Sequence, residues 1–239
     1  AQCLVGSEMC IRDSNNIVVK KPPYKETIGA QYYCFNTPDS GNNFDLESYD
    51  EKVNKTETVK SVKITESAES TPIYGSGKVY DTRTLLAYVD IEVESLASDA
   101  DDLAKMRGDV TTEHGLIQGL TTPLKPYFAY GKVVKLSGGN FRLDWYPKCQ
   151  LVENNEESST IEDKFEEQND SLIIRAYAFD EEGKLFKNSI DSSSTKFPEG
   201  VTEEKFFNKP IITDADLAAI IPTAVSYTHL RAHETLSDL

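Results

Sequence analysis

The sequence predicts a mainly β protein, an antiparallel β-sandwich or barrel with one or two short flanking helices. The first observation is a stretch, 85–94, in which apolar and polar residues alternate. A period of two indicates a strand with one buried face and one wet face. The second observation is the count of elements, about eight short strand-like segments against two or three short helical ones. No internal repeat or coiled-coil heptad competes with this interpretation.

The alternating stretch is the most regular part of the chain. We expect its apolar side to pack in a core and its other side, which holds three carboxylates, to face water. The apolar side consists of Leu85, Ala87, Val89, Ile91 and Val93, and the other side of Leu86, Tyr88, Asp90, Glu92 and Glu94.

A short helix is expected directly after this strand. Ser98 stands in the position of an N-cap, Asp101 follows three residues later as in a capping box, and Gly108 is suited to end the helix. Asp99, Asp101 and Asp102 resemble paired catalytic carboxylates. At a helix start, however, they have a sufficient structural role, because they offset the positive end of the helix dipole.

The chain before this region contains two further strand candidates and a long polar stretch. Gly29–Phe35 is aromatic-rich and predicts a core strand, and Thr58–Thr65 predicts another, after a brief apolar start at Ile17–Val19. The stretch 36–60 has no sustained period over most of its length. It predicts a long polar loop or an extended hairpin arm, and long excursions from compact domains are usually functional or disordered.

The chain after Gly108 continues with strands and turns. A turn-rich link leads into a strand over 126–136, and 137–140 (SGGN) predicts a hairpin turn into a return strand over 141–152. On that return strand Phe141, Leu143 and Trp145 share one face, and Arg142, Asp144 and Tyr146 share the other. An acidic loop is expected over 153–170, strands over 171–180 and 184–187, and short helices near 202–208 and 214–220.

Both ends of the chain are expected to be non-native. Residues 1–14 and 225–239 resemble translated sequencing-adapter DNA joined to an incomplete reading frame, and the first segment makes a poor signal peptide. We therefore assign 15–224 as a single β domain. The cysteines and histidines of the two end segments are excluded from any site hypothesis: Cys3, Cys10, His229 and His233.

Composition restricts the classes of function. The chain has a formal net charge of −15, which argues against tight nucleic-acid binding, because Lys and Arg supply affinity for phosphate backbones. No apolar run approaches the length of a membrane-spanning helix. Only Cys34 and Cys149 remain between the end segments, and they are far apart. A reduced, cytoplasmic site of synthesis is the simpler interpretation, with one disulfide as the alternative.

Catalytic and ligand-binding motifs are weak. Tyr74–Lys78 (YGSGK) invites a phosphate-loop interpretation, but the first Gly of that motif would fall at Pro72 and Val79 replaces its Ser or Thr. Turn glycines between two strands explain it better. His114 is the only histidine outside the end segments, so a catalytic triad would depend on it alone. The acidic run 153–170 lacks EF-hand spacing. The sequence predicts no catalytic residue, no cofactor and no metal site.

Four blocks of sequence, in order, resemble the major tail protein of long-tailed, non-contractile bacteriophages. The strongest is 72–108, PIYGSGKVYDTRTLLAYVDIEVESLASDADDLAKMRG, with its long strand and capped helix. The others are KPYFAYGKVVKLSGGNFRLDWYPKCQL (125–151), EEQNDSLIIRAYAFDEEGKLFKN (166–188) and EEKFFNKP (203–210). The chain departs from the family pattern in its long polar insertion at 36–60.

This resemblance implies a fold and a role. Tail tube subunits are β-sandwiches or barrels with a flanking helix, and they assemble into hexameric rings that stack into a hollow tube for the phage genome. The expected location is the virion, after synthesis in the host cytoplasm. The expected partners are other copies of the chain, tape-measure protein and tail-terminator or tail-tip proteins, with no membrane. DNA is expected to pass without tight binding.

On this interpretation Asp90, Glu92 and Glu94 are candidates for a negative inner wall of the tube, where like charge keeps DNA from adhering. A carbohydrate- or receptor-binding β-sandwich module is the alternative. A cluster of exposed Trp and Tyr around a groove would favour it, although the chain has only one Trp. A hydrolase is a third possibility, which the scarcity of histidine makes weak.

Overall fold

The computed structural model describes residues 20–38, 43–158, 160 and 168–222. In this part of the chain, strands dominate and all strand pairs are antiparallel, so the predicted mainly β class is confirmed. The main sheet contains, in spatial order, β2 (Asn54–Thr56), β1 (Lys25–Phe35), β7 (Phe128–Leu136), β8 (Phe141–Glu156), β9 (Asp170–Ala176), β4 (Lys78–Ser95) and β3 (Val59–Gly75), and β10 (Asn188–Asp191) pairs with β8.

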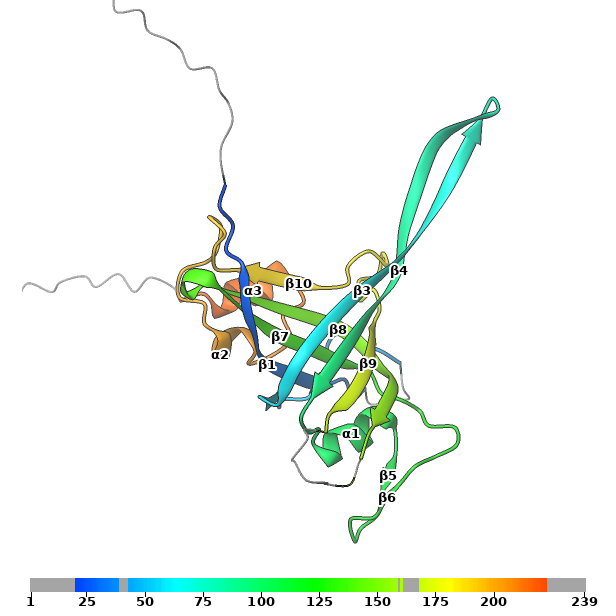
Figure 1. Ribbon diagram of the computed structural model, residues 1–239, viewed down its shortest axis with the longest axis vertical. Helices are drawn as coiled ribbons and strands as arrows, with labels where there is room; N and C mark the ends of the chain where they lie inside the picture. Colours follow the sequence, from blue (N-terminus) through cyan, green and yellow to red (C-terminus); the bar gives the residue numbers. More distant parts are fainter. Residues whose placement is uncertain (1–19, 39–42, 159, 161–167, 223–239) are drawn as a thin grey trace, which may run out of the picture.

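Three helices and a small hairpin complete the described structure. They are α1 (Ala100–Arg107), α2 (Glu203–Phe206) and α3 (Asp214–Ile220), with β5 (Val110–Thr111) pairing with β6 (Ile117–Gln118). The main sheet curls so that β1 and β3 approach each other, but it does not close into a barrel (Figure 1). The curl gives the sheet an inner face and an outer face.

Each face of the sheet has its own hydrophobic core, and β8 contributes to both. Tyr146 and Cys149 belong to the inner core, whereas Leu143 and Trp145 belong to the outer core, with Phe141 packed against it. This confirms the two faces predicted for 141–146. Cys34 lies in the outer core and Cys149 in the inner core, and both are free thiols. The sheet itself therefore separates them.

Helix α1 packs against the inner core, to which it contributes the buried Met106. The predicted helix is confirmed, but its N-cap is Asp99 rather than Ser98: the Asp99 carboxylate accepts hydrogen bonds from the backbone N–H groups of Asp101 and Asp102. A carboxylate can accept both bonds, which suits it to the positive end of the helix. Gly108 ends the helix in the left-handed region, with φ of 74°, as predicted.

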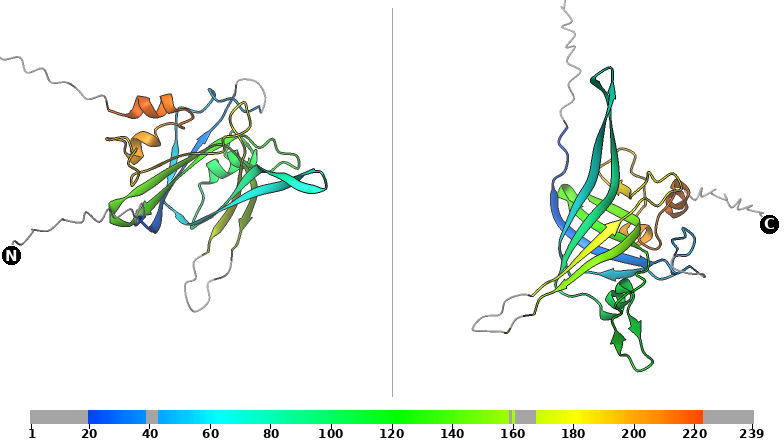
Figure 2. Two further views of the ribbon diagram at one scale, coloured as in Figure 1. Left: turned by 90° about the horizontal axis from the view of Figure 1, so that it is seen from above. Right: turned by 90° about the vertical axis from the view of Figure 1, so that its right-hand side faces the viewer.

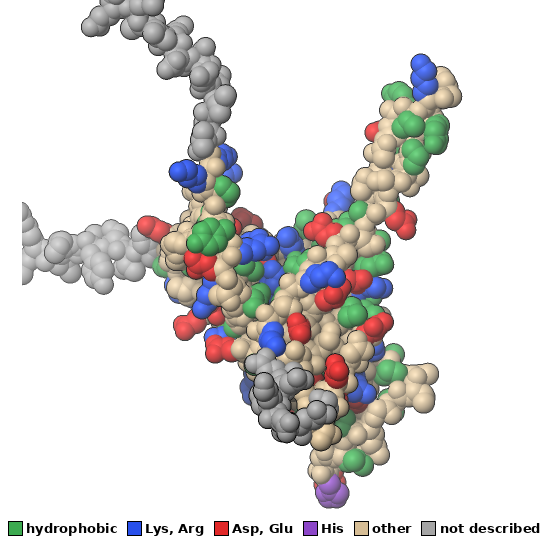
Figure 3. All heavy atoms as spheres, viewed as in Figure 1, with side chains coloured by type: hydrophobic (Ala, Val, Ile, Leu, Met, Phe, Trp, Pro, Cys, Tyr) green, Lys and Arg blue, Asp and Glu red, His purple; other side chains and the backbone are tan. Residues whose placement is uncertain are grey.

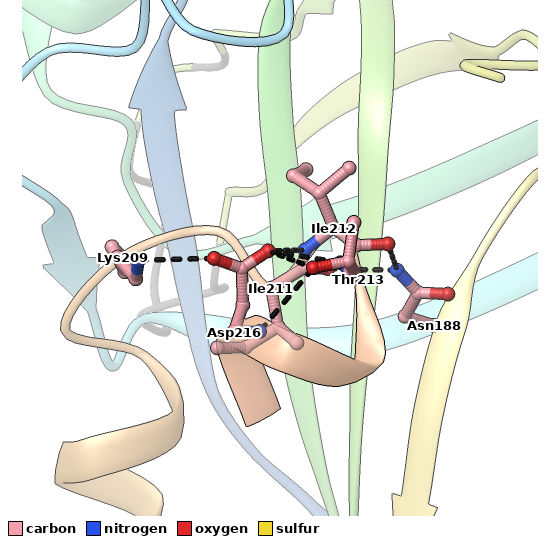
Figure 4. A network of polar contacts seen from close by, with 6 residues as sticks. All are labelled: Asn188, Lys209, Ile211, Ile212, Thr213 and Asp216. Atoms are coloured by element: carbon pink, nitrogen blue, oxygen red, sulfur yellow. Dashed lines mark hydrogen bonds and ion pairs between the residues drawn. The ribbon is translucent and has the colours of Figure 1, made fainter. Parts of the chain in front are cut away.

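The C-terminal segment covers the outer face of β1, β7 and β8. Phe207 stacks on Tyr32 with ring centroids 3.9 Å apart, and its ring lies so close to Gly131 that a Cβ there would be 2.6 Å away. The start of α3 is fixed by a capping box between Thr213 and Asp216 (Figure 4). The Asn188 amide of β10 donates to the carbonyl oxygens of residues 211 and 212 and ties this segment to the sheet.

The β3–β4 hairpin is much longer than the two strands predicted for 58–65 and 85–94. Strand β9 pairs with β4 only from Val89 to Ser95, and beyond Val89 the two strands of the hairpin continue alone. We call residues 66–86 the ribbon. It projects from the sheet in all three ribbon views (Figures 1 and 2).

Other sequence predictions need correction. The described part of 36–60 does not form an extended arm: residues 54–56 pair with β1, and the Tyr49 hydroxyl donates to the Pro147 carbonyl oxygen. The last sheet strand is 188–191 rather than 184–187, because only the later residues pair with β8. The predicted strand 171–180 ends at Ala176. The two end segments and most of the acidic loop after Glu156 lie outside the described residues.

Candidate assembly surfaces

The ribbon is the least buried part of the described chain. From Ala68 to Leu85 every residue is exposed, although the two strands stay paired throughout. At its tip, Ser76 and Gly77 both have positive φ, 51° and 73°, as a type I′ turn requires. The YGSGK segment is therefore a hairpin turn, which agrees with the turn interpretation of its glycines.

The ribbon carries large exposed apolar side chains, most of them near its tip and one, Leu85, near its base. Tyr74 is 70% exposed, Tyr80 is 84% exposed and Leu85 is 74% exposed, and Ile73 and Val79 are also exposed. Figure 3 shows hydrophobic side chains along the end of the ribbon. Both outer edges of the ribbon also lack a pairing strand among the described residues. Exposed apolar side chains on unpaired strand edges form a template for contact with another chain.

A second apolar projection lies at the opposite end of the molecule. The segment 109–124, which includes the β5–β6 hairpin, extends beyond α1, away from the ribbon (Figures 1 and 2). Its large exposed apolar side chains are Val110, Leu116, Ile117, Leu120 and Leu124. His114 sits exposed in the turn of this hairpin. The molecule thus presents two exposed apolar projections that point in different directions.

The three predicted wall carboxylates lie on one face of β4, as the alternation predicted. They are on the outer face, beyond the area that the C-terminal segment covers, and each is partly exposed. Asp90 forms a two-pronged ion pair with Arg175 at 2.7 and 3.1 Å, and Glu92 pairs with Lys63 at 3.0 Å. Glu94 accepts hydrogen bonds from the Ser61 hydroxyl on the neighbouring β3 and from the Asn169 amide.

This pairing changes the electrostatic argument for the three carboxylates. Because cations on adjacent strands balance Asp90 and Glu92, the row is closer to neutral than the sequence of β4 alone indicates. The Arg175 guanidinium also lies 3.9 Å over the ring of Tyr88, on the same face. Whether this face looks into a tube stays a prediction.

A buried ion-pair cluster on the inner face was not predicted. Lys132 on β7 and Asp144 on β8 are both almost fully buried, and the Lys132 ammonium donates to Asp144 Oδ2. Burial lowers the pKa of Lys132, an effect that the carboxylate partner opposes. Burial alone would raise the pKa of Asp144, but the charge and hydrogen bond of Lys132, together with the Ser189 hydroxyl and Arg142, hold that pKa below its usual value. Period-two alternation could have placed both residues on the inner face.

Features of an enzyme or lectin site are weak within the described residues. No group of three or more His, Cys, Asp or Glu side chains is placed there to hold a metal ion. The single Trp, Trp145, is fully buried, and its indole N–H donates to the Phe206 carbonyl oxygen. The exposed Tyr74 and Tyr80 stand on a convex projection instead of lining a groove. No helix of the described part is both long and apolar enough to cross a membrane.

Comparison with known proteins adds no family assignment. No protein-family model matches the sequence, and a search of curated proteins found no relative.

Proposed function

We propose that this protein is a self-assembling structural subunit of the tail-tube kind, which forms rings that stack into a tube in the virion of a long-tailed phage. The observation that carries the proposal is the ribbon. A two-stranded hairpin without a core is only marginally stable in water, yet this one extends far beyond its sheet and exposes aromatic side chains. A partner that covers the ribbon would account for both properties.

Two apolar projections at opposite ends also suit assembly. A heterologous contact joins two different surfaces of identical subunits, and repetition of such contacts builds rings or filaments. In this proposal the ribbon and the 109–124 segment provide surfaces for contacts between successive rings. The hexameric ring number and the tape-measure and terminator partners rest on the sequence resemblance alone.

A shortened ribbon tests the proposal. Replacing residues 70–84 by Asn-Gly leaves Glu69 and Leu85, which are paired in the hairpin, to flank a two-residue turn. The free energy of unfolding should change by no more than about 1 kcal/mol, because the deleted residues are exposed. At high concentration the full chain should form rings and tubes visible by negative-stain microscopy, and the shortened chain should not.

Two point substitutions test whether the exposed apolar side chains, and not only the length of the ribbon, are needed for polymerisation. Tyr80→Ser should weaken polymerisation, whereas Tyr24→Ser should not, although Tyr24 is also 70% exposed. Equal polymerisation of the full and shortened chains would contradict the role of the ribbon. A full chain that stays monomeric at every concentration, while it binds a polysaccharide, would support the carbohydrate-binding module instead.

A further inference from the structure

A cleft of about 480 Å³ opens between β1 and β3, where the two sides of the curled sheet approach each other. Apolar side chains of the inner face form its walls. Four cationic side chains and one carboxylate also line it: Lys25, Lys60, Lys132, Arg142 and Glu26. This excess of positive charge occurs in a chain with a net charge of −15. Figure 3 shows Lys and Arg side chains gathered between the start of the described chain and the base of the ribbon.

Two of the lining cations, Lys132 and Arg142, lie beside the same carboxylate, that of Asp144. Asp144 Oδ2 accepts the hydrogen bond of Lys132, and its other oxygen accepts one from the Ser189 hydroxyl. Arg142 Nε lies 3.4 Å from that same oxygen, Oδ1, but it is buried and makes no hydrogen bond. The Asp144 carboxylate therefore lies beside two cations, and the buried N–H of Arg142 Nε has no acceptor. An additional carboxylate or similar anion at the cleft would balance this charge.

The complementary surface lies on the same chain, at the end where α1 begins. Asp50 binds Lys105 of α1 at 2.8 Å, and Asn54 donates to Asp102 at 2.6 Å, so the segment 50–54 lies against the helix. We call the resulting surface the acidic end. Its carboxylates are Asp50, Glu51, Asp99, Asp101 and Asp102.

Asp102 lies close to two other carboxylates of the acidic end, Asp99 and Asp101. Burial, together with the nearby charges of Asp99 and Asp101, raises the pKa of Asp102. Lys105 and Asn54 oppose this shift but do not cancel it. Like-charge crowding of this kind is relieved when a cationic surface binds over it.

We propose that the cationic cleft between β1 and β3 binds the acidic end of a second copy of this chain. The inference rests on the proposed function for the existence of an assembly and names one contact within it. The cleft and the acidic end are different surfaces of one subunit, so the contact is heterologous and can repeat from copy to copy. A nucleic acid is a poorer occupant, because the strongly negative chain repels a long polyanion.

A charge-swap experiment tests this contact without requiring tubes. Variant one carries Lys25→Glu and Lys60→Glu and so loses the cleft charge. Variant two carries Glu51→Lys and Asp101→Lys and so loses the acidic end. All four positions are exposed, and both variants should fold like the parent chain. Controls with the same change of net charge elsewhere are Lys184→Glu with Lys196→Glu, and Glu181→Lys with Glu199→Lys.

Sedimentation velocity at about 150 mM salt is the measurement, because that ionic strength screens long-range repulsion and leaves short-range ion pairs. Each variant alone should associate at least about ten-fold more weakly than the parent chain, a change that mutation of close charge pairs can produce. Their equimolar mixture should recover association, because the intact acidic end of variant one can meet the intact cleft of variant two, and the two reversed surfaces are again opposite in charge. A chain with all four substitutions should recover self-association.

Three results would overturn the contact: a mixture that does not associate, variants that associate as well as their controls, or a parent chain that stays monomeric. Inorganic phosphate provides a further arm. If phosphate raises the melting temperature of the parent chain but not of variant one, and the mixture does not associate, the cleft binds a small anion instead. If the shortened chain forms no tubes while the charge-swapped mixture still associates, the ribbon contact and the contact between cleft and acidic end are two independent contacts.

Discussion

Strands β3 and β4 pair with each other along the whole hairpin, but its two halves lie in opposite environments. In the inner half Val89, Ile91 and Val93 are almost fully buried, whereas in the ribbon Leu85 is 74% exposed. The difference begins where β9 stops pairing with β4, at Val89. Burial in this hairpin therefore depends on a third strand and on α1, and not on the pattern of the hairpin itself.

A bulge accompanies this change. Ser67 pairs with Tyr88 but Ala68 pairs with Leu86, so Ala87 has no counterpart. An extra residue shifts which side chains share a face and increases the local twist. The alternation that predicts a buried Leu85 and Ala87 is thus wrong for those two residues and correct from Val89 onward.

The largest contrast is expected from truncating one apolar residue in each half. Ile91→Ala should lower the free energy of unfolding by about 2–5 kcal/mol, because it removes a fully buried side chain from the inner core. Leu85→Ala should change it by less than about 0.5 kcal/mol. Urea denaturation measures both. A cost for Leu85→Ala close to that for Ile91→Ala would show that the isolated chain packs its ribbon.

Two glycines with positive φ extend the comparison to the backbone. At Gly108 a Cβ would lie 2.5 Å from the Leu124 carbonyl oxygen, whereas at Gly77 in the ribbon nothing lies within 4 Å. Gly108→Ala should therefore cost on the order of 2 kcal/mol or more. Gly77→Ala should add roughly 1 kcal/mol of strain to the turn alone.

Thermal unfolding should detect the first glycine substitution and hardly register the second. Amide hydrogen exchange should instead detect Gly77→Ala as faster exchange confined to the ribbon. If Gly77→Ala lowered the stability of the whole domain, the ribbon and the sheet would be one cooperative unit.

The smallest effect is expected for the ion pairs of Asp90 and Glu92, on the outer face of the sheet. Arg175→Gln removes the ion pair with Asp90 and should cost about 0.5 kcal/mol, because the pair is partly exposed and screened by solvent. Lys63→Gln, which removes the more exposed pair with Glu92, should cost less. Chemical denaturation at low and high salt measures both, and a cost that does not fall with salt would point to lost packing on Tyr88.

Sequence reasoning succeeded where a local signal decides the structure. The helix 214–220 was predicted with the bounds of α3. The SGGN turn between β7 and β8 was also predicted, and its two glycines have the positive φ that glycine adopts without steric cost. It was less accurate at Asp99, since Ser98 and Asp99 are adjacent and both residue types cap helices. It missed the meeting of Lys132 and Asp144, which depends on the register of two strands.

The sequence by itself determined the mainly β class, the two faces of β8 and the turns, because these follow from residue periodicity and backbone preferences. Only the tertiary structure decided where the sheet ends and the ribbon begins, and how the two sides of the sheet approach to form a cationic cleft. The physical reason is that burial and ion pairing depend on which distant strands meet. Strand pairing brings together residues that no local pattern connects.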